Sequence, residues 1–156
     1  MNSFTAASKI EKLGKERWWK KMNIISSEWR ECVDKEENMN CGDCLCIPLN
    51  EYHEWKFEEE DRYGNFYFET YSNKSKNFPG WMFKNMKAQF LWYGFLDTGK
   101  VYLFDFIKLK EWFKENYLTY KEKPQGKYVQ NNDTWGRPVS IKVMKELGFI
   151  IEEFDF

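Results

Sequence analysis

Charged and apolar side chains alternate along residues 52–58, and this pattern predicts a β-strand. Residues two apart in a strand point to the same side of a sheet, roughly 6.6 Å from each other. Glu54 and Lys56 therefore share one face, and His53, Trp55 and Phe57 share the other. The fold must then accommodate an acidic and a basic group side by side on one face of a strand whose opposite face is bulky and apolar.

Shorter strand patterns surround this one. Residues 44–47 form a brief run that ends at Pro48, and residues 65–71 alternate again after a turn at 61–64. Connections this short favour an antiparallel meander of three strands. Residues 90–95 and 101–105 are rich in aromatic side chains, and Asp97-Thr98-Gly99 between them predicts a hairpin.

Helical patterns lie on both sides of the strands. Ser8-Lys9-Ile10-Glu11 is typical of a capping box that opens a helix, and a second helical piece is predicted over 27–37, before a break at 38–42. Residues 107–116 predict a helix, residues 121–135 an extended loop, and Pro138 a last helix that Gly148 ends, followed by a closing strand over 149–154.

These elements predict an α+β (mixed α/β) fold in one domain, 1–156. Its central sheet is built on the meander and the hairpin and is flanked by helices. Residues 1–38 would be the N-terminal helices, 43–116 the core, and 117–156 a C-terminal loop, helix and strand.

The charge balance argues for a soluble protein of the bacterial cytoplasm. Charged residues make up 31% of the chain, no apolar run approaches the roughly 18 residues of a membrane span, and the N-terminus lacks a signal-peptide core. The net charge of −1 conceals segregation, because residues 28–71 carry −9 while residues 1–27 carry +4 and residues 72–130 carry +6. An acidic block between lysine-rich flanks fits either a metal site beside a phosphate-binding surface or an ordinary solvated acidic surface.

Asp43 lies where the chain enters the strand predicted at 44–47, next to the strand of Glu54 and Lys56. Carboxylates such as Asp43 and Glu54 are the hard oxygen ligands that Mg²⁺ or Mn²⁺ prefers, with several waters kept. Lys56 would orient a metal-bound water and offset charge that develops on a phosphate. Glu69, expected one strand over, would support this site or bind a second ion, and Glu28 or Glu31 is a weaker possibility.

In this arrangement the chain resembles the PD-(D/E)XK nuclease superfamily, and more closely its small phage and mobile-element members. The matching pieces are Gly42-Asp43, Glu54-Trp55-Lys56, Tyr67-Phe68-Glu69, Pro79-Gly80-Trp81, residues 90–93 and Leu109-Lys110-Glu111-Trp112. The resemblance implies a restriction-endonuclease-like core, metal-dependent hydrolysis of phosphodiester bonds in DNA, with RNA as the less favoured substrate, and a homodimer as one form of assembly. Lys74, Lys76, Lys84 and Lys87 would hold the phosphate backbone, and Trp81 would stack on an unpaired base.

Three alternatives stay open. Glu54 and Lys56 could be an ordinary surface pair across strands. Cys41-x-x-Cys44-x-Cys46, with Cys32 and His53, has enough ligands for a zinc-stabilised interaction module, although thiols on one strand face also pack as small hydrophobes. The chain could also be a non-catalytic binding protein on the same fold, such as an anti-CRISPR or anti-restriction inhibitor of a host nucleic-acid enzyme.

Overall fold

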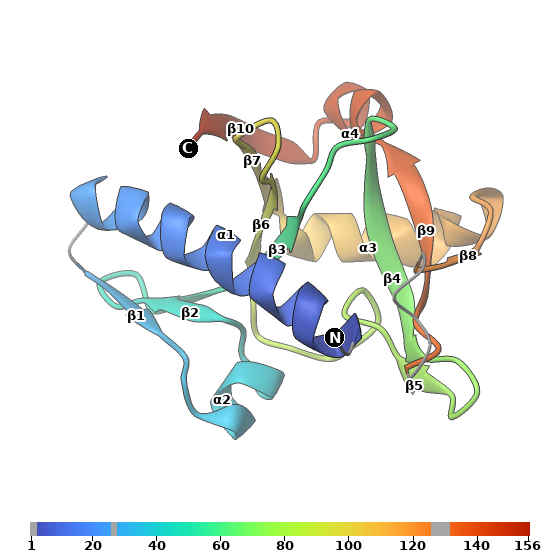
Figure 1. Ribbon diagram of the computed structural model, residues 1–156, viewed down its shortest axis with the longest axis horizontal. Helices are drawn as coiled ribbons and strands as arrows, with labels where there is room; N and C mark the ends of the chain where they lie inside the picture. The colour runs from blue at the N-terminus through green and yellow to red at the C-terminus, as the bar shows by residue number, and fades with distance from the viewer. Residues whose placement is uncertain (1–2, 26–27, 126–131) are drawn as a thin grey trace.

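The chain folds into two β-sheets with helices packed against them. The computed structural model describes residues 3–25, 28–125 and 132–156, and four α-helices and ten strands lie in these ranges (Figure 1). The predicted α+β class is therefore confirmed.

The larger sheet has six strands in the order β1-β2-β3-β6-β7-β10. Neighbouring strands are antiparallel except β3 and β6, which run parallel. Its strands are β1 (Trp29–Glu31), β2 (Cys44–Cys46), β3 (Glu51–Glu58), β6 (Phe90–Phe95), β7 (Lys100–Asp105) and β10 (Ile150–Asp155). The β2–β3 pair and the β6–β7 hairpin are thus confirmed, as is the closing strand.

The third strand of the predicted meander is not in this sheet, so that part of the prediction is wrong. Strand β4 (Asn65–Asn73) belongs to a second sheet of order β5-β4-β9-β8, with β5 (Phe78–Pro79), β9 (Trp135–Ser140) and β8 (Lys123–Pro124). The place beside β3 is taken by β6. A short connection brings β4 near β3 but does not oblige it to hydrogen-bond there, and the core side chains of β4 decide its position.

Aromatic side chains fill the space between the two sheets. Phe66 and Phe68 of β4 are fully buried, and the Phe66 ring contacts Phe95, Tyr102 and Phe104 of the larger sheet at centroid distances of 4.9–5.9 Å. Edge-to-face aromatic pairs of this kind contribute beyond the area they bury. Burial of the β4 phenylalanines against the β6–β7 hairpin therefore explains why β4 starts a second layer.

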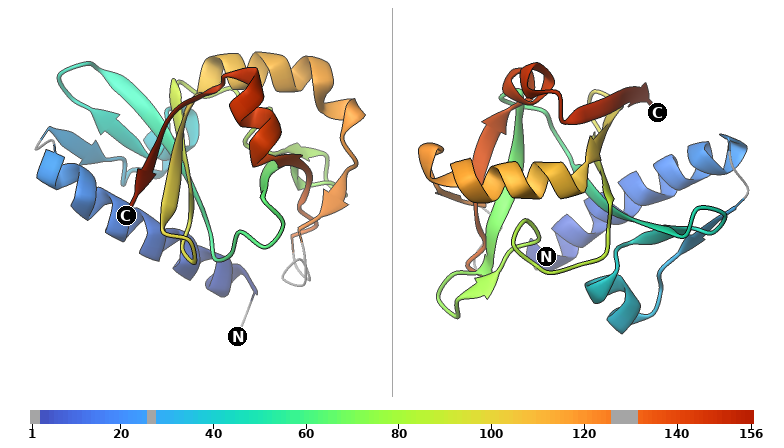
Figure 2. Two further views of the ribbon diagram at one scale, coloured as in Figure 1. Left: turned by 90° about the horizontal axis from the view of Figure 1, so that it is seen from above. Right: turned by 180° about the vertical axis from the view of Figure 1, so that it is seen from behind.

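Helix α1 (Ser3–Ile25) crosses one face of the larger sheet, while α3 (Phe106–Asn116) lies on the other face (Figures 1 and 2). Trp18 of α1 is 1% exposed and packs with Trp92 and Phe154. Gly14 allows the close approach of the helix, because a Cβ there would lie 2.2 Å from Cγ of Phe57.

Two helix predictions near the N-terminus are wrong. Helix α1 already begins at Ser3, so the supposed capping box at Ser8 lies inside it. Residues 29–31 form strand β1 rather than a helix, because β1 completes the edge of the sheet by pairing with β2. The second helix, α2 (Lys35–Asn40), begins later, where the Asp34 side chain accepts a hydrogen bond from the Glu37 N–H and caps it.

The C-terminal prediction needs a similar correction. Pro138 lies in strand β9, opposite Tyr67 of β4, and helix α4 (Ile141–Leu147) starts only after it, with Gly148 ending it in the left-handed conformation. Strand β8 pairs only with Trp135 and Gly136, so one side of β9 has no partner strand at Pro138 and a residue without an N–H is tolerated there. The loop predicted over 121–135 contains β8 and the 3-10 turn η1 (Tyr117–Thr119) precedes it, while residues 126–131 lie outside the described part.

The helices of the described residues include none with the length and apolar character that a membrane crossing requires.

We predict that Gly14→Ala destabilises the protein, although alanine favours helix formation. The added Cβ would overlap the Phe57 ring, so helix α1 must shift away from β3. Overpacking of this kind costs about 1–3 kcal/mol in the free energy of unfolding, which urea denaturation would measure. Leu13→Ala, at a neighbouring position that is 48% exposed, is the control and should change stability much less. Equal stability of Gly14→Ala and wild type would contradict the close packing of α1 on β3.

Candidate functional site

Strands β2 and β3 bring Asp43 and Glu54 together, as the sequence predicted. Asp43 directly precedes β2, and its backbone N–H donates to the His53 carbonyl at 2.8 Å. Its side-chain Oδ2 accepts from the Trp55 N–H at 2.8 Å. Both carboxylates are buried, with Asp43 7% and Glu54 5% exposed. Lys56 follows on the same face of β3, and its Nζ lies 2.9 Å from Oε1 of Glu54.

Helix α1 adds two charged side chains that the sequence prediction did not include. Lys15 Nζ lies 2.9 Å from Oδ1 of Asp43 and 3.6 Å from Oε1 of Glu11. Glu11 in turn lies 3.7 Å from Lys56 Nζ. Carboxylates and ammonium groups therefore alternate from Glu54 through Lys56, Glu11 and Lys15 to Asp43. We call these five residues the charge network.

A signal for these two residues was present in the sequence. Glu11 and Lys15 are four residues apart, which places them on one side of a helix. That side adjoins the one that buries Trp18 and Gly14. Interpreting Glu11 as a capping residue concealed this spacing, because a capping box assigns that side chain to the start of the helix and not to a contact with the sheet.

Glu69 reaches the same region from the second sheet, not from a strand next to β3, which corrects its predicted position. Its Oε1 accepts from the Trp81 N–H at 3.3 Å. Lys56 Nζ lies 5.7 Å from the centroid of the Trp81 ring. Burial raises the pKa of the Glu69 carboxyl, and the positive charge of Lys56 opposes this. Glu69 is therefore electrostatically coupled to Lys56 despite the separate sheets.

The pKa values of the site show how the charges balance. Burial raises the pKa of Glu54 to about 7, and the carboxylates of Asp43 and Glu11 add to this while Lys56 opposes it. Burial alone would lower the pKa of Lys56, but Glu54, Glu11 and Asp43 together raise it. Burial would likewise raise the pKa of Asp43, yet Lys56 and Lys15 hold it below its usual value. Asp43 is thus ionised, while Glu54 retains a proton to unusually high pH.

Four carboxylates and four ammonium groups lie in this region. Glu11, Asp43 and Glu54 are paired with Lys15 and Lys56, and Lys56 and Lys84 lie within electrostatic range of Glu69. Lys110 lies within electrostatic range of Glu54. The pKa values of Glu54 and Glu69 are raised first of all because burial disfavours the ionised carboxylate.

The donor set of Asp43 and Glu54 fits Mg²⁺ or Mn²⁺. Mg²⁺ usually takes one or two protein carboxylates and keeps several waters. Within residues 3–25, 28–125 and 132–156, no three His, Cys, Asp or Glu side chains are arranged to share a metal ion. Asp43 and Glu54 supply the one or two protein carboxylates that Mg²⁺ usually takes.

The cysteines and His53 are separately engaged. All four cysteines are free and buried. Cys44 Sγ accepts from the Trp55 indole N–H at 2.7 Å, and burial raises the pKa of its thiol, which disfavours the thiolate that zinc binds. His53 Nδ1 accepts from Trp92 Nε1 at 2.9 Å, and burial lowers the pKa of the imidazole to about 3. These contacts are typical of side chains that pack in the core rather than of zinc ligands.

The four predicted phosphate-binding lysines do not lie in one place. Lys74 is paired with Glu122, and its Nζ lies 4.3 Å from the centroid of the Trp135 ring. Lys76 is exposed in the turn between β4 and β5. Lys84 and the exposed Lys87 lie in the segment before β6, and Lys84 is near enough to lower the pKa of Glu69. Lys84 is therefore the member of this set that the structure couples to the site carboxylates.

The Trp81 side chain is packed in the core. It is 6% exposed, and its ring contacts Phe68, Tyr93 and Phe106 at centroid distances of 6.0–6.4 Å. A ring this enclosed has no free face for a nucleobase. The predicted stacking role of Trp81 is therefore not supported, and the residue instead forms the apolar wall beside Lys56 and Glu69.

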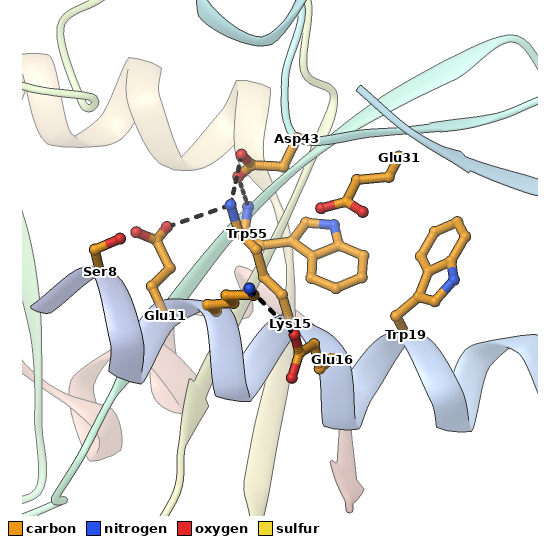
Figure 3. A pocket seen from close by; sticks show the side chains of 9 residues that line it. Ser8, Glu11, Lys15, Glu16, Trp19, Glu31, Asp43 and Trp55 are labelled. Atoms are coloured by element: carbon orange, nitrogen blue, oxygen red, sulfur yellow. Dashed lines mark hydrogen bonds and ion pairs between the residues drawn. The ribbon is translucent and has the colours of Figure 1, made fainter. Parts of the chain in front are cut away.

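The sequence predicted that Glu28 and Glu31 lie in a helix, but the structure places them elsewhere. Glu31 ends strand β1 and lines a pocket of about 310 Å³ that also includes Asp43, Lys15 and two tryptophans (Figure 3). Glu28 precedes β1. The pocket lies between α1 and the edge of the larger sheet formed by β1 to β3 (Figure 3).

No known family model matches the chain, and the comparisons with curated proteins and with solved structures give no match either.

The raised pKa of Glu54 predicts a pH dependence of stability. A carboxyl whose folded-state pKa lies above its ordinary value of 4.5 favours the folded state when protonated, so stability falls as pH rises from about 4.5 to about 7. Glu54→Gln removes this contribution, on the order of 3 kcal/mol for a shift of that size. Urea denaturation across this pH range should show the variant gaining stability relative to wild type as pH increases.

A matched control is Glu60→Gln, whose side chain is 50% exposed and should leave the pH profile unchanged. Wild type and Glu54→Gln both keep some pH dependence of stability from Glu58, because burial raises the pKa of Glu58 to about 8. Parallel profiles for Glu54→Gln and wild type would show that Glu54 titrates normally in the folded protein.

Proposed function

We propose that this protein is a metal-dependent nuclease-like protein that hydrolyses phosphodiester bonds in DNA. The observation that carries the proposal is the convergence of Asp43, Glu54 and Lys56 from two neighbouring strands, with both carboxylates buried and coupled to the same ammonium group. An ordinary surface ion pair would leave its charged groups in contact with water, whereas burying charged groups costs free energy.

The arrangement of the elements supports a restriction-endonuclease-like core within the larger sheet. Asp43 enters β2, the acidic-x-Lys segment lies on the adjacent antiparallel β3, and α1 packs across these strands. This is the order that the PD-(D/E)XK resemblance implies, and the structure adds the parallel strand β6 beside β3.

The residues would divide the chemistry as follows. A divalent ion held by Asp43 and Glu54 would polarise the scissile phosphate and lower the pKa of a bound water. Lys56 would position that water and offset charge on the phosphate oxygens. Glu11 and Glu54 hold the Lys56 ammonium from two sides, at 3.7 and 2.9 Å. The Trp55 N–H and Asn38 Nδ2, at 2.8 and 2.9 Å, fix the orientation of the Asp43 carboxylate.

Glu69 and Lys84 would complete the surroundings. Glu69 lies near Lys56 and Lys84, whose positive charges oppose the rise in its pKa, and Lys84 would meet a phosphate near the site. Lys110 of α3 also lies within electrostatic range of Glu54. Lys84 and Lys110 would add positive charge on the side of the segment before β6.

The direct test is cleavage of supercoiled plasmid and of branched DNA in Mg²⁺ or Mn²⁺. Asp43→Asn, Glu54→Gln and Lys56→Met should each lower the rate by at least about 100-fold, the scale on which loss of one electrostatic catalytic group acts. Glu60→Gln is the control and should cleave as wild type does, since its side chain is 50% exposed and away from the charge network.

Circular dichroism and thermal unfolding should show that the three variants keep the wild-type fold. Cleavage that survives Glu54→Gln in a folded variant would contradict the proposal. Terbium luminescence, sensitised by the neighbouring tryptophans, gives a second readout, because Asp43→Asn and Glu54→Gln should weaken ion binding whether or not cleavage is observed.

One observation favours a second function, namely a non-catalytic binding protein such as an inhibitor of a host nucleic-acid enzyme. Asp43 and Glu54 each already have an ammonium partner, Lys15 and Lys56, at 2.9 Å. A site satisfied in this way is stable without a metal. This function predicts a stoichiometric complex with a nucleic-acid-processing protein that forms in EDTA, together with no cleavage by wild type under any divalent ion.

A further inference from the structure

The pocket beside Asp43 is a separate feature from the Glu54–Lys56 face of β3. It measures about 310 Å³ and opens between α1 and the strands β1 to β3 (Figure 3). Trp55, whose side chain points to the opposite face of β3 from Glu54 and Lys56, lines it, and Trp19 of α1 lies beside Trp55. Glu11, Lys15 and Asp43 belong to both the pocket and the charge network.

Two indoles form the aromatic wall of this pocket. Trp55 is 2% exposed, and its N–H is used by Cys44, so its ring is a fixed part of the wall. The ring of Trp19 lies 6.0 Å from it, tilted by 35°. Trp19 is only partly buried, so part of its ring remains available for stacking.

The polar groups of the pocket restrict what can enter. Glu11, Glu16 and Asp43 have lysine partners, namely Lys15 for Glu11 and Asp43, and Lys12 for Glu16. The Glu31 side chain, by contrast, makes no ion pair or hydrogen bond within the described parts of the chain, and it faces the same space (Figure 3). The carboxylates repel a phosphate, and the Glu31 carboxylate is left to accept a hydrogen bond from a donor group.

A neutral aromatic ring that carries an amino group satisfies these conditions. Its face can stack on the Trp19 indole, and its amino group can donate to Glu31, as exocyclic amino groups of bases donate to Glu and Asp. Outside the pocket, α1 presents the exposed Arg17 and Lys20 to a phosphate backbone.

We propose that this pocket receives one unpaired nucleobase with an exocyclic amino group, next to the phosphate that is cleaved. The inference rests on the proposed function, and it specifies the substrate class. Because Asp43 is common to the pocket and the charge network, a nucleotide whose phosphate lies at Asp43 and Glu54 has its base beside the pocket. A base in a continuous duplex is stacked and paired and would have to be flipped out at an energetic cost, so the favoured substrate is single-stranded, flapped or branched DNA.

The test measures binding in EDTA, where no cleavage takes place. Short fluorescent oligodeoxycytidine, oligodeoxythymidine and a duplex are titrated with wild type and with Trp19→Leu, which keeps an apolar contact but removes the aromatic face. Trp19→Leu should lose oligodeoxycytidine affinity by about 5- to 150-fold, the contribution of one base–aromatic stack. Duplex affinity should not change, and Trp19→Phe should restore much of the loss.

Tyr63→Leu is the matched control, since Tyr63 is 78% exposed and lies in the connection between β3 and β4. Glu31→Ala tests the amino group. Wild type should bind oligodeoxycytidine more tightly than oligodeoxythymidine, whose base has no amino group, and Glu31→Ala should abolish that difference. Near-ultraviolet circular dichroism checks that each variant is folded.

Several outcomes would overturn the inference. The first is that folded Trp19→Leu and wild type bind oligodeoxycytidine with equal affinity. The second is that wild type binds no oligonucleotide. The third is that an arginine-rich peptide competes for the pocket and oligodeoxycytidine does not. These outcomes are distinct from failure of the proposed function. Wild type that binds in the expected way but never cleaves contradicts the nuclease activity alone. Flap cleavage that Trp19→Leu leaves unchanged contradicts the pocket alone.

Discussion

Lys56 is the group on which the arrangement of this site depends. Its ammonium is held by Glu54 from its own strand and by Glu11 from helix α1, and it lies over the ring of Trp81. Removing the Lys56 ammonium or a partner carboxylate from water costs free energy, and this cost is offset only when the partners are close and well oriented. The ion pairs therefore fix how α1 lies against β3. Without Lys56, the buried Glu54 would lose its ammonium partner at 2.9 Å, which would favour its protonated form.

The apolar core makes these ion pairs possible because it holds the two sheets in place. Phe66 and Phe68 join the second sheet to the β6–β7 hairpin, and the Tyr93 hydroxyl, which is hydrogen-bonded to Glu58 of β3, accepts from the Tyr67 N–H of β4 at 3.0 Å. On the opposite face, Trp18 secures α1 against Trp92. The charge network therefore lies where helix α1 meets strands β2 and β3, with Glu69 of the second sheet beside it.

The predictions that depended on local pattern were confirmed most often. Alternation identified β3 and β4, and the aromatic hairpin and the left-handed end of α4 at Gly148 also follow from local rules. Two of the failures have one cause. Nothing local in residues 29–31 or at Pro138 indicates a strand, because β1 and β9 exist through their pairing with β2 and β4. Strand pairing is a long-range interaction, and propensity yields to it.

For the site, the sequence by itself determined that Glu54 and Lys56 share a face, since alternation in a strand requires it, and that Asp43 enters the neighbouring strand. Only the tertiary structure decided that Glu11 and Lys15 join them, that Glu69 approaches from another sheet, and that Trp81 is enclosed while Trp19 lines a pocket. The reason is physical. Side-chain direction along one strand follows from backbone geometry, whereas contacts between elements follow from which apolar surfaces bury each other, and these involve residues far apart in the chain.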